Sequence, residues 1–279
     1  KYEYLKLPMG LANSPDIFQE KMGDLFADLE SVRAYIDDLL ILSRGTWEDH
    51  LTELEEVLTR LQDNGLKVNI RKYFFGQHEL EYLGYWISRN GIQPLKKKVD
   101  AILKIAEPKN RKQLRSFIGM INYYRDMWKG RAEMLAPLTA LTSDNVPFKW
   151  TQIQSDAFKR VKDALSKEVL LTYHDFSKPF DIHTDASDSQ LGAVISQNNM
   201  PVAFYSRKLT NTQRNYTTTK RELLAIVETL KEYRNILYGQ QIKVHMDHKN
   251  LTCVNFNTQR VIQWQMVIKD FGPELVYIP

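Results

Sequence analysis

Residues 32–42 read Val-Arg-Ala-Tyr-Ile-Asp-Asp-Leu-Leu-Ile-Leu, and this stretch decides the fold of the amino-terminal part. Short apolar runs flank Asp37 and Asp38, which predicts two strands joined by a turn with both carboxylates at its tip. Adjacent carboxylates repel each other, and a hard cation such as Mg²⁺, which also binds phosphates, relieves that repulsion. A solvated turn is the alternative interpretation, because Asp is a good turn former.

The composition predicts a soluble globular protein of two domains or three small ones. The 279 residues are 43% hydrophobic and 26% charged, which is enough apolar material for real cores. No apolar run approaches the roughly 18 residues of a transmembrane helix, so we expect no membrane partner. The only cysteine, Cys253, forms no internal disulfide and excludes a Cys-rich zinc site. It fits an intracellular, reducing compartment.

Positive charge is concentrated in the middle of the chain. The whole sequence carries a net charge of +4, whereas residues 94–133 hold eleven Lys or Arg and four acids, a net +7. Such a segment predicts a surface for a polyanion such as nucleic acid. The alternative is that the long cationic side chains only solvate helices.

The periodicity of apolar residues divides the chain into three parts. Helices over 16–29 and 46–64, the Asp-Asp hairpin, and strands over 67–75 and 81–88 predict an α+β layer. A helical part follows, with helices over 96–106, 111–128, 131–141 and 151–166. Strands over 180–183, 191–197, 202–206 and 242–246, with a helix over 219–237, predict an α/β domain with a mixed sheet.

A second set of acids lies in this last part. Asp185 ends a predicted strand, Glu222 lies in the first turns of the long helix, and Asp247 ends a later strand. A sheet could bring the three carboxylates to one point, where paired Mg²⁺ ions would relieve their repulsion and support phosphodiester hydrolysis. The alternative is two surface aspartates and a glutamate that interacts with the helix dipole.

Ordered motifs along the chain resemble a known family. Leu-Pro-Met-Gly-Leu-Ala-Asn-Ser-Pro at 7–15, Tyr-Ile-Asp-Asp at 35–38, Tyr-Leu-Gly-Tyr at 82–85 and Asn-Tyr-Tyr-Arg at 122–125 are similar to reverse transcriptase motifs. Thr-Asp-Ala-Ser at 184–187, Lys-Arg-Glu-Leu-Leu-Ala at 220–225 and Asp-His-Lys-Asn-Leu at 247–251 resemble ribonuclease H. Together they resemble the Pol polyprotein of gypsy-type LTR retrotransposons.

The resemblance implies an architecture and a function. It implies a partial α+β palm over 1–91, a helical thumb or connection over 92–170, and a ribonuclease H-like domain over 171–279. The implied activities are DNA synthesis on an RNA template and hydrolysis of the RNA strand of the hybrid. Implied partners are RNA template, DNA primer, RNA–DNA hybrid, dNTPs and, in the intact element, protease and integrase domains. The implied location is a cytoplasmic virus-like particle or the nucleus.

The resemblance also assigns roles to residues. Each site would hold two Mg²⁺ ions, which Mn²⁺ can replace, through Asp37 and Asp38 or through Asp185, Glu222 and Asp247. The nucleotide and primer–template would contact Met9, Gly10, Gln19, Tyr35, Lys72, Leu83, Gly84 and Tyr85. The nucleic-acid backbone would contact Lys96, Lys97, Lys98, Lys112 and Arg115.

Departures from the family pattern leave alternatives open. The resemblance places a third polymerase aspartate before Lys1 and a fourth ribonuclease acid after Pro279, so we expect each site to lack one acid and the isolated chain to be impaired. One alternative is a domesticated or relic nucleic-acid-binding module without catalysis. Another is a hybrid-specific nuclease in which only the ribonuclease H half is competent.

Overall fold

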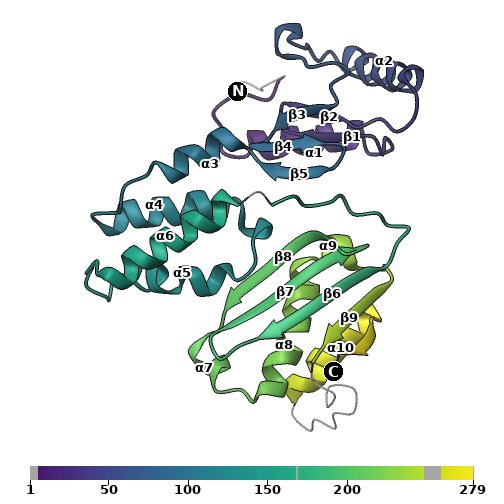
Figure 1. Cartoon of the computed structure of the whole chain (residues 1–279). Coiled ribbons are helices and arrows are strands. Elements are labelled where there is room, and N and C mark those ends of the chain that lie inside the picture. The colour runs from purple at the N-terminus through teal and green to yellow at the C-terminus, as the bar shows by residue number, and fades with distance from the viewer. Residues whose placement is uncertain (1–5, 168, 248–258, 279) are drawn as a thin grey trace, which may run out of the picture. The chain divides into compact units, whose positions relative to one another are not determined.

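The computed structural model describes residues 6–167, 169–247 and 259–278, and the chain divides into two compact units, 1–77 and 78–279 (Figure 1). The division into three domains over 1–91, 92–170 and 171–279 stays a prediction. Within the described ranges, every helix is too short or too polar to span a bilayer.

The first unit packs two helices on a two-stranded hairpin. Its elements are α1 (Ser14–Leu25), β1 (Val32–Tyr35), β2 (Asp38–Ile41), α2 (Trp47–Asp63) and the 3₁₀ turn η1 (Ile70–Lys72). The antiparallel strands pair Tyr35 with Asp38, so a two-residue loop closes the hairpin. The core consists of buried side chains from both helices and β1: Met22, Phe26, Val32, Val57 and Leu61.

Local sequence signals fix the limits of α2. Thr46 and Asp49 form a capping box, in which the Thr46 side chain accepts from the Asp49 amide and the Asp49 carboxylate accepts from the Thr46 amide. At the other end Gly65 has a φ of 67°, and the Leu66 amide donates to the Leu61 carbonyl at 2.9 Å. This is a glycine-terminated C-cap.

Two strand predictions in this region are wrong. Residues 67–75 contain no strand; they form extended chain around η1, where the Asn69 side chain accepts from the Arg71 amide. The strand expected over 81–88 is interrupted by a turn. It becomes β3 (Glu79–Tyr82) and β4 (Tyr85–Ser88), which form a three-stranded antiparallel sheet with β5 (Gly91–Pro94).

The helical part of the second unit follows this sheet. Its elements are α3 (Lys96–Leu103), α4 (Arg111–Asn122), η2 (Arg125–Met127), α5 (Arg131–Ala140) and α6 (Gln152–Ser166). The helix expected over 111–128 therefore ends early, and a 3₁₀ turn replaces its last part. The helices share one core, whose most buried members include Leu114, Phe117, Ile121, Leu138, Ala157 and Val161.

The carboxy-terminal domain is a mixed five-stranded sheet. It contains β6 (Phe180–Ala186), β7 (Gln190–Gln197), β8 (Met200–Lys208), α7 (Asn211–Arg214), α8 (Thr218–Glu232), α9 (Arg234–Leu237), β9 (Ile242–Met246), α10 (Gln259–Phe271) and β10 (Glu274–Tyr277). The strand order is β10-β9-β6-β7-β8, and β9 runs parallel to both β6 and β10. Helix α8 packs against β6 and β7 and contacts α10 (Figure 1). The predicted α/β fold with a mixed sheet is confirmed.

Direct bonds join the helical part to this sheet. The Arg131 guanidinium is mostly buried and donates to the Ser206 carbonyl at 3.0 Å, and the Ala132 amide donates to the Ser206 hydroxyl at 2.9 Å. An ion pair at 2.8 Å joins Arg125 to Glu232. The two parts are therefore fastened along β8 and the end of α8.

Candidate active sites

The Asp37–Asp38 hairpin has a strained tip. Ile36 has a φ of 52°, a conformation that β-branched residues rarely adopt and that costs on the order of 1–3 kcal/mol. The Gln19 side chain holds this tip in place. Its Oε1 accepts from the Ile36 amide at 2.5 Å, and its Nε2 donates to the Ala34 carbonyl at 3.1 Å. The two aspartates are consequently exposed on a backbone that α1 fixes.

The structure therefore gives Gln19 a role that the sequence did not suggest. Both polar ends of its amide bond the hairpin backbone, so the side chain orients the acids. Direct contact between Gln19 and a nucleotide stays a prediction. No spacing rule could have found this clamp, because its partners lie 15 and 17 residues away along the chain.

Other predicted contact residues of the first unit lie on its surface. Met9 is fully exposed, Gly10 has a φ of 93°, and the Tyr35 ring is exposed beside Asp38. Lys72 is exposed at the end of η1. All four are accessible to a ligand, and their contacts with primer, template or nucleotide stay predictions.

The cations of the basic segment differ in exposure and in their bonds within the fold. Lys96, Lys97 and Lys98 are exposed in the first turn of α3, where the helix dipole disfavours positive charge. Lys97 pairs with Glu81 at 2.5 Å. These exposed cations destabilise the helix start, whereas they would bind a polyanion favourably. This supports the predicted contact with a nucleic-acid backbone.

Lys112 and Arg115 lie on the outer face of α4 and differ in their partners. Lys112 is exposed, whereas the Arg115 guanidinium donates to the Thr142 carbonyl at 2.6 and 3.1 Å and pairs with Asp144 at 2.9 Å. Arg115 therefore fastens the loop after α5, a use that the charge count could not reveal.

The three acids of the carboxy-terminal domain come from neighbouring elements. In the parallel pair of β6 and β9, His183 lies opposite His245, so Asp185 and Asp247 follow at the same level two residues later. Glu222 enters from the second turn of α8 and is only 3% exposed. The strand register and the position of Glu222 at the start of α8 thus bring the three carboxyl groups close together.

The pKa of Glu222 records this convergence. Burial, followed by the nearby charges of Asp247 and Asp185, raises it from 4.5 to about 7. The Ala186 amide, which donates to the carboxylate, and the Arg221 guanidinium offset part of this rise. The Glu222 Oε2 atom is buried and has no hydrogen-bond partner among the residues that the structure describes. A charged Glu222 is therefore costly unless a cation lies beside it.

Neighbouring residues that the sequence did not point to surround these acids. Arg221 is buried and forms a close ion pair with Asp188, in the turn between β6 and β7. The rings of His183 and His245 stack with centroids 4.4 Å apart, and His245 Nε2 lies 2.8 Å from the Asp181 carboxylate. Alternation along β6 places Asp181, His183 and Asp185 on one face, and this signal was available in the sequence.

The donor set fits a hard divalent cation. Carboxylate oxygens are the ligands that Mg²⁺ and Mn²⁺ prefer, and the unpaired Glu222 oxygen offers one at the point where three acids converge. Within residues 6–167, 169–247 and 259–278, no three His, Cys, Asp or Glu side chains form a ready-made metal cage. The structure thus gives the electrostatic signature of a cation site without its coordination geometry. His248 to Leu251, the rest of the third motif, lie outside the described residues.

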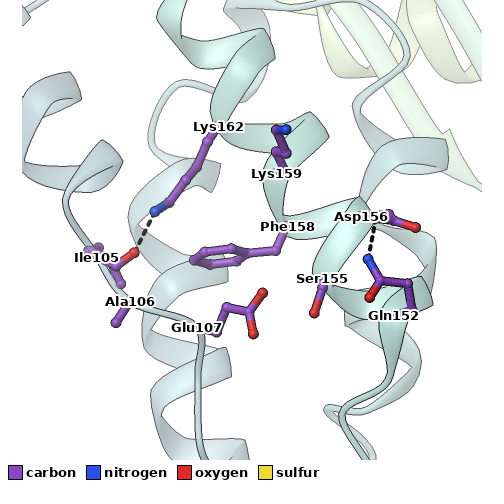
Figure 2. Close-up of a pocket in the computed structure, with 9 residues that line it drawn as sticks. All are labelled: Ile105, Ala106, Glu107, Gln152, Ser155, Asp156, Phe158, Lys159 and Lys162. Carbon is purple, nitrogen blue, oxygen red and sulfur yellow. Dashed lines mark hydrogen bonds between the residues drawn. The ribbon is translucent and has the colours of Figure 1, made fainter.

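A pocket elsewhere in the second unit contains none of the predicted site residues. It has a volume of about 520 Å³ and lies between α6 and the segment that follows α3 (Figure 2). Figure 2 shows Lys162 reaching the Ile105 carbonyl, and the same ammonium donates to the Leu103 carbonyl at 2.8 Å. The lysine therefore caps the end of α3 and joins α3 to α6.

The raised pKa of Glu222 predicts how stability depends on pH without metal. The folded state holds the proton more tightly than the unfolded state, so this contribution is complete below about pH 4.5 and is lost as pH rises through about 7. We expect Glu222→Gln to stabilise the metal-free chain at pH 8 by up to about 3 kcal/mol, and to change little at pH 5. Denaturant unfolding with EDTA at both pH values measures this difference.

Added Mg²⁺ should make the wild type more stable than Glu222→Gln, which reverses the order expected without metal. At pH 8 the ion should stabilise the wild-type chain more than it stabilises Glu222→Gln, because the variant keeps Asp185 and Asp247 but lacks the third carboxylate. Glu228→Gln on the same helix, which removes an ion pair with Arg207 at 3.2 Å, is the matched control. If the difference in free energy of unfolding between the wild type and Glu222→Gln is the same at pH 5 and at pH 8, the carboxyl group of Glu222 is not buried and coupled as described.

Comparison with known proteins agrees with this geometry. Residues 1–87 match the family "Reverse transcriptase (RNA-dependent DNA polymerase)", and residues 150–244 match the "RNase H-like domain found in reverse transcriptase". The whole chain is 35% identical over 292 aligned positions to the Transposon Tf2-3 polyprotein of Schizosaccharomyces pombe, and 34% identical to the Tf2-7 polyprotein. It spans 22% of the length of these relatives.

Solved structures with the same fold include those of a foamy virus. A foamy viral protease-reverse transcriptase in complex with double-stranded DNA has a TM-score of 0.87 at 25% identity, over 98% of this chain and 50% of that one. The same kind of protein in complex with an RNA/DNA hybrid has a TM-score of 0.86 at 25% identity, over 99% of this chain and 39% of that one. The chain belongs to the reverse transcriptase and RNase H family of LTR-retrotransposon Pol polyproteins.

Proposed function

We propose that this chain carries catalytic residues of a retrotransposon enzyme that copies RNA into DNA and hydrolyses the RNA strand of the resulting hybrid. The observation that carries the proposal is Glu222, a buried carboxyl group with an unpaired oxygen and a pKa raised to about 7 beside two further acids. A protein tolerates such a group most readily where a cation and a phosphodiester complete the site.

In the RNase H-like domain the chain's own residues would build a negatively charged cradle. Asp185, Glu222 and Asp247 would hold two Mg²⁺ ions, or Mn²⁺ ions in their place. When bound, such ions lower the pKa of an attacking water and neutralise charge on the leaving oxygen. The Ala186 amide orients the Glu222 carboxylate, and burial keeps that carboxylate out of bulk water.

In the first unit Asp37 and Asp38 would play the corresponding part for DNA synthesis. The Gln19 clamp holds both acids at the tip of the hairpin, where they can bind Mg²⁺ beside a primer hydroxyl and a dNTP. Phosphoryl transfer depends mainly on positioning and charge stabilisation, which suits a fixed pair of carboxylates.

Nucleic acid is the substrate that the charge distribution and the solved relatives support. The exposed lysines of α3 face solvent, and the foamy viral relatives are complexes with double-stranded DNA and with RNA/DNA hybrid. We propose that this chain recognises the hybrid by its backbone and 2′-hydroxyl groups, with little dependence on sequence. Association with protease and integrase domains and location in an intracellular virus-like particle or the nucleus belong to the same proposal.

The test compares three labelled duplexes of one sequence: RNA–DNA hybrid, double-stranded RNA and double-stranded DNA. With Mg²⁺ or Mn²⁺ we expect cleavage of the RNA strand in the hybrid alone, because only the hybrid combines a 2′-hydroxyl strand with a DNA strand. EDTA should stop the reaction. Binding of the hybrid without cleavage under any of these conditions would favour a non-catalytic nucleic-acid-binding module.

A further inference from the structure

The turn between β3 and β4 has an unfavourable backbone conformation. Leu83 and Gly84 have φ values of 45° and 76°, and they form the two-residue loop between the paired residues Tyr82 and Tyr85. Glycine adopts a positive φ readily, whereas leucine rarely does. Contacts from outside the hairpin must therefore hold Leu83 in place.

Two tyrosine hydroxyls beyond the end of α4 supply these contacts. The Tyr123 hydroxyl donates to the Leu83 carbonyl in a close hydrogen bond, and the Tyr124 hydroxyl donates to the Gly84 carbonyl at 3.0 Å. Both bonds join residues 40 positions apart. Each carbonyl of the strained turn is thus bonded to a different phenol of the helical part.

Tyr85 completes what we call the tyrosine clasp, formed by Tyr85, Tyr123 and Tyr124. Its hydroxyl donates to the Tyr123 carbonyl at 2.9 Å, and its ring stacks on the Tyr123 ring with centroids 5.3 Å apart. It also meets the Tyr124 ring edge-on at 5.5 Å. Burial raises the pKa of Tyr85 and of Tyr124, so both phenols remain protonated donors at neutral pH.

Gly84 is required by the same arrangement. A Cβ atom there would lie 3.3 Å from Tyr123 Cε1 and 3.0 Å from Lys98 Nζ, and the positive φ would add strain. The Tyr123 ring is 47% exposed, and the Lys98 ammonium lies 5.8 Å from its centroid. The outer face of the clasp therefore combines an aromatic ring with a cation, which suits a sugar–phosphate backbone.

We propose that Tyr123 and Tyr124 are positioning residues for the 3′ end of a DNA primer, because their phenols fix the Leu83–Gly84 turn against which the last nucleotide rests. The proposal rests on the proposed function and on the contact of Leu83 and Gly84 with the primer–template that the family resemblance implies. A loose turn would let the terminal nucleotide move, and it would leave the upstream duplex bound as before. The clasp therefore predicts an effect confined to the end of the primer.

The test is photo-crosslinking with the 279-residue chain and a DNA primer annealed to an RNA template. A 4-thiothymidine lies either at the 3′ terminus of the primer or about ten nucleotides upstream. We expect Tyr123→Phe and Tyr124→Phe each to lower the terminal cross-link about fivefold, the factor that corresponds to about one hydrogen bond. The upstream cross-link should stay unchanged in both variants.

Tyr173→Phe is the matched control. The Tyr173 phenol donates to the Ser88 carbonyl at 3.0 Å, so it bonds the same sheet at the other end of β4. Its removal should leave both cross-links unchanged. Tyr123→Phe keeps the test decisive if the buried Tyr124→Phe variant folds poorly, because Tyr123 is half exposed.

Each other outcome overturns the proposal. An unchanged yield of the terminal cross-link in both Tyr123→Phe and Tyr124→Phe excludes the clasp as a positioning device. Equal losses at both probe positions indicate a general loss of binding or folding. A wild-type chain without a terminal cross-link excludes the primer end from this turn. In that case the same preparation is tested for cleavage of the RNA strand in a hybrid. Cleavage would show that the proposed function holds although the positioning proposal fails.

Discussion

Glu222→Gln should lower the rate of RNA-strand cleavage in a hybrid by at least about 10³-fold, which corresponds to about 4 kcal/mol of lost transition-state stabilisation. The substitution keeps the shape of the side chain and removes its charge. Since Glu222 is buried beside Asp185 and Asp247, its charge serves the site and has no ion-pair partner in the described part of the fold. Single-turnover kinetics with a labelled hybrid measure the loss.

Two comparisons separate catalysis from folding. Glu228→Gln changes the same residue type six positions along α8 and removes a partly exposed ion pair, so its rate should stay within a few fold of the wild type. Glu222→Gln should also be at least as stable as the wild type at pH 8 without metal, for the reason given by its raised pKa. A Glu222→Gln variant that cleaves at the wild-type rate would remove Glu222 from the active site.

The sequence predicted elements best where the signal was local. The strand over 242–246 was predicted with the limits that the structure gives, because the apolar residues Ile242, Val244 and Met246 alternate with polar ones. Helix α2 was predicted within one residue at each end, since a capping box and Gly65 mark its limits. In both cases the residues that define the element are neighbours along the chain.

Predictions failed where the structure depends on distant partners. Residues 67–75 contain apolar and aromatic side chains and resemble a strand, yet Ile70 and Phe74 are each 76% exposed and no strand pairs with them. Strand propensity largely reflects packing against a neighbour, which a sequence pattern does not supply. The turn at Leu83–Gly84 was missed for a related reason, because Leu83 has a positive φ and its carbonyl is bonded by Tyr123, which lies 40 residues away in sequence.

The candidate sites show the same division. Asp185, Glu222 and Asp247 could be assigned from strand ends and a helix start, and the structure brings them together. Their supporting residues could not be assigned in this way. The Gln19 clamp, the Arg221–Asp188 pair and the use of Arg115 within the fold all join residues that are far apart in sequence.

Asp37→Asn and Asp38→Asn should each lower template-dependent primer extension by at least about 10³-fold, because a neutral amide binds a hard cation much more weakly than a carboxylate does. Both side chains are exposed at the hairpin tip, and the hairpin is held by Gln19, so the fold should not depend on their charge. Primer–template affinity and thermal stability should therefore stay close to the wild type. Extension of a labelled primer on an RNA template measures the rate.

Asp24→Asn is the matched control, because this exposed aspartate lies in the same unit at the end of α1 and pairs only loosely with Lys21, at 3.7 Å. A third variant, Gln19→Met, keeps both acids and removes the clamp. It should give an intermediate loss, since the acids remain while the strained Ile36 turn loses two hydrogen bonds. Full activity of Asp37→Asn or Asp38→Asn would show that the hairpin is an ordinary solvated turn. If only Gln19→Met keeps full activity, the reaction requires the two acids but does not require the hydrogen bonds of Gln19.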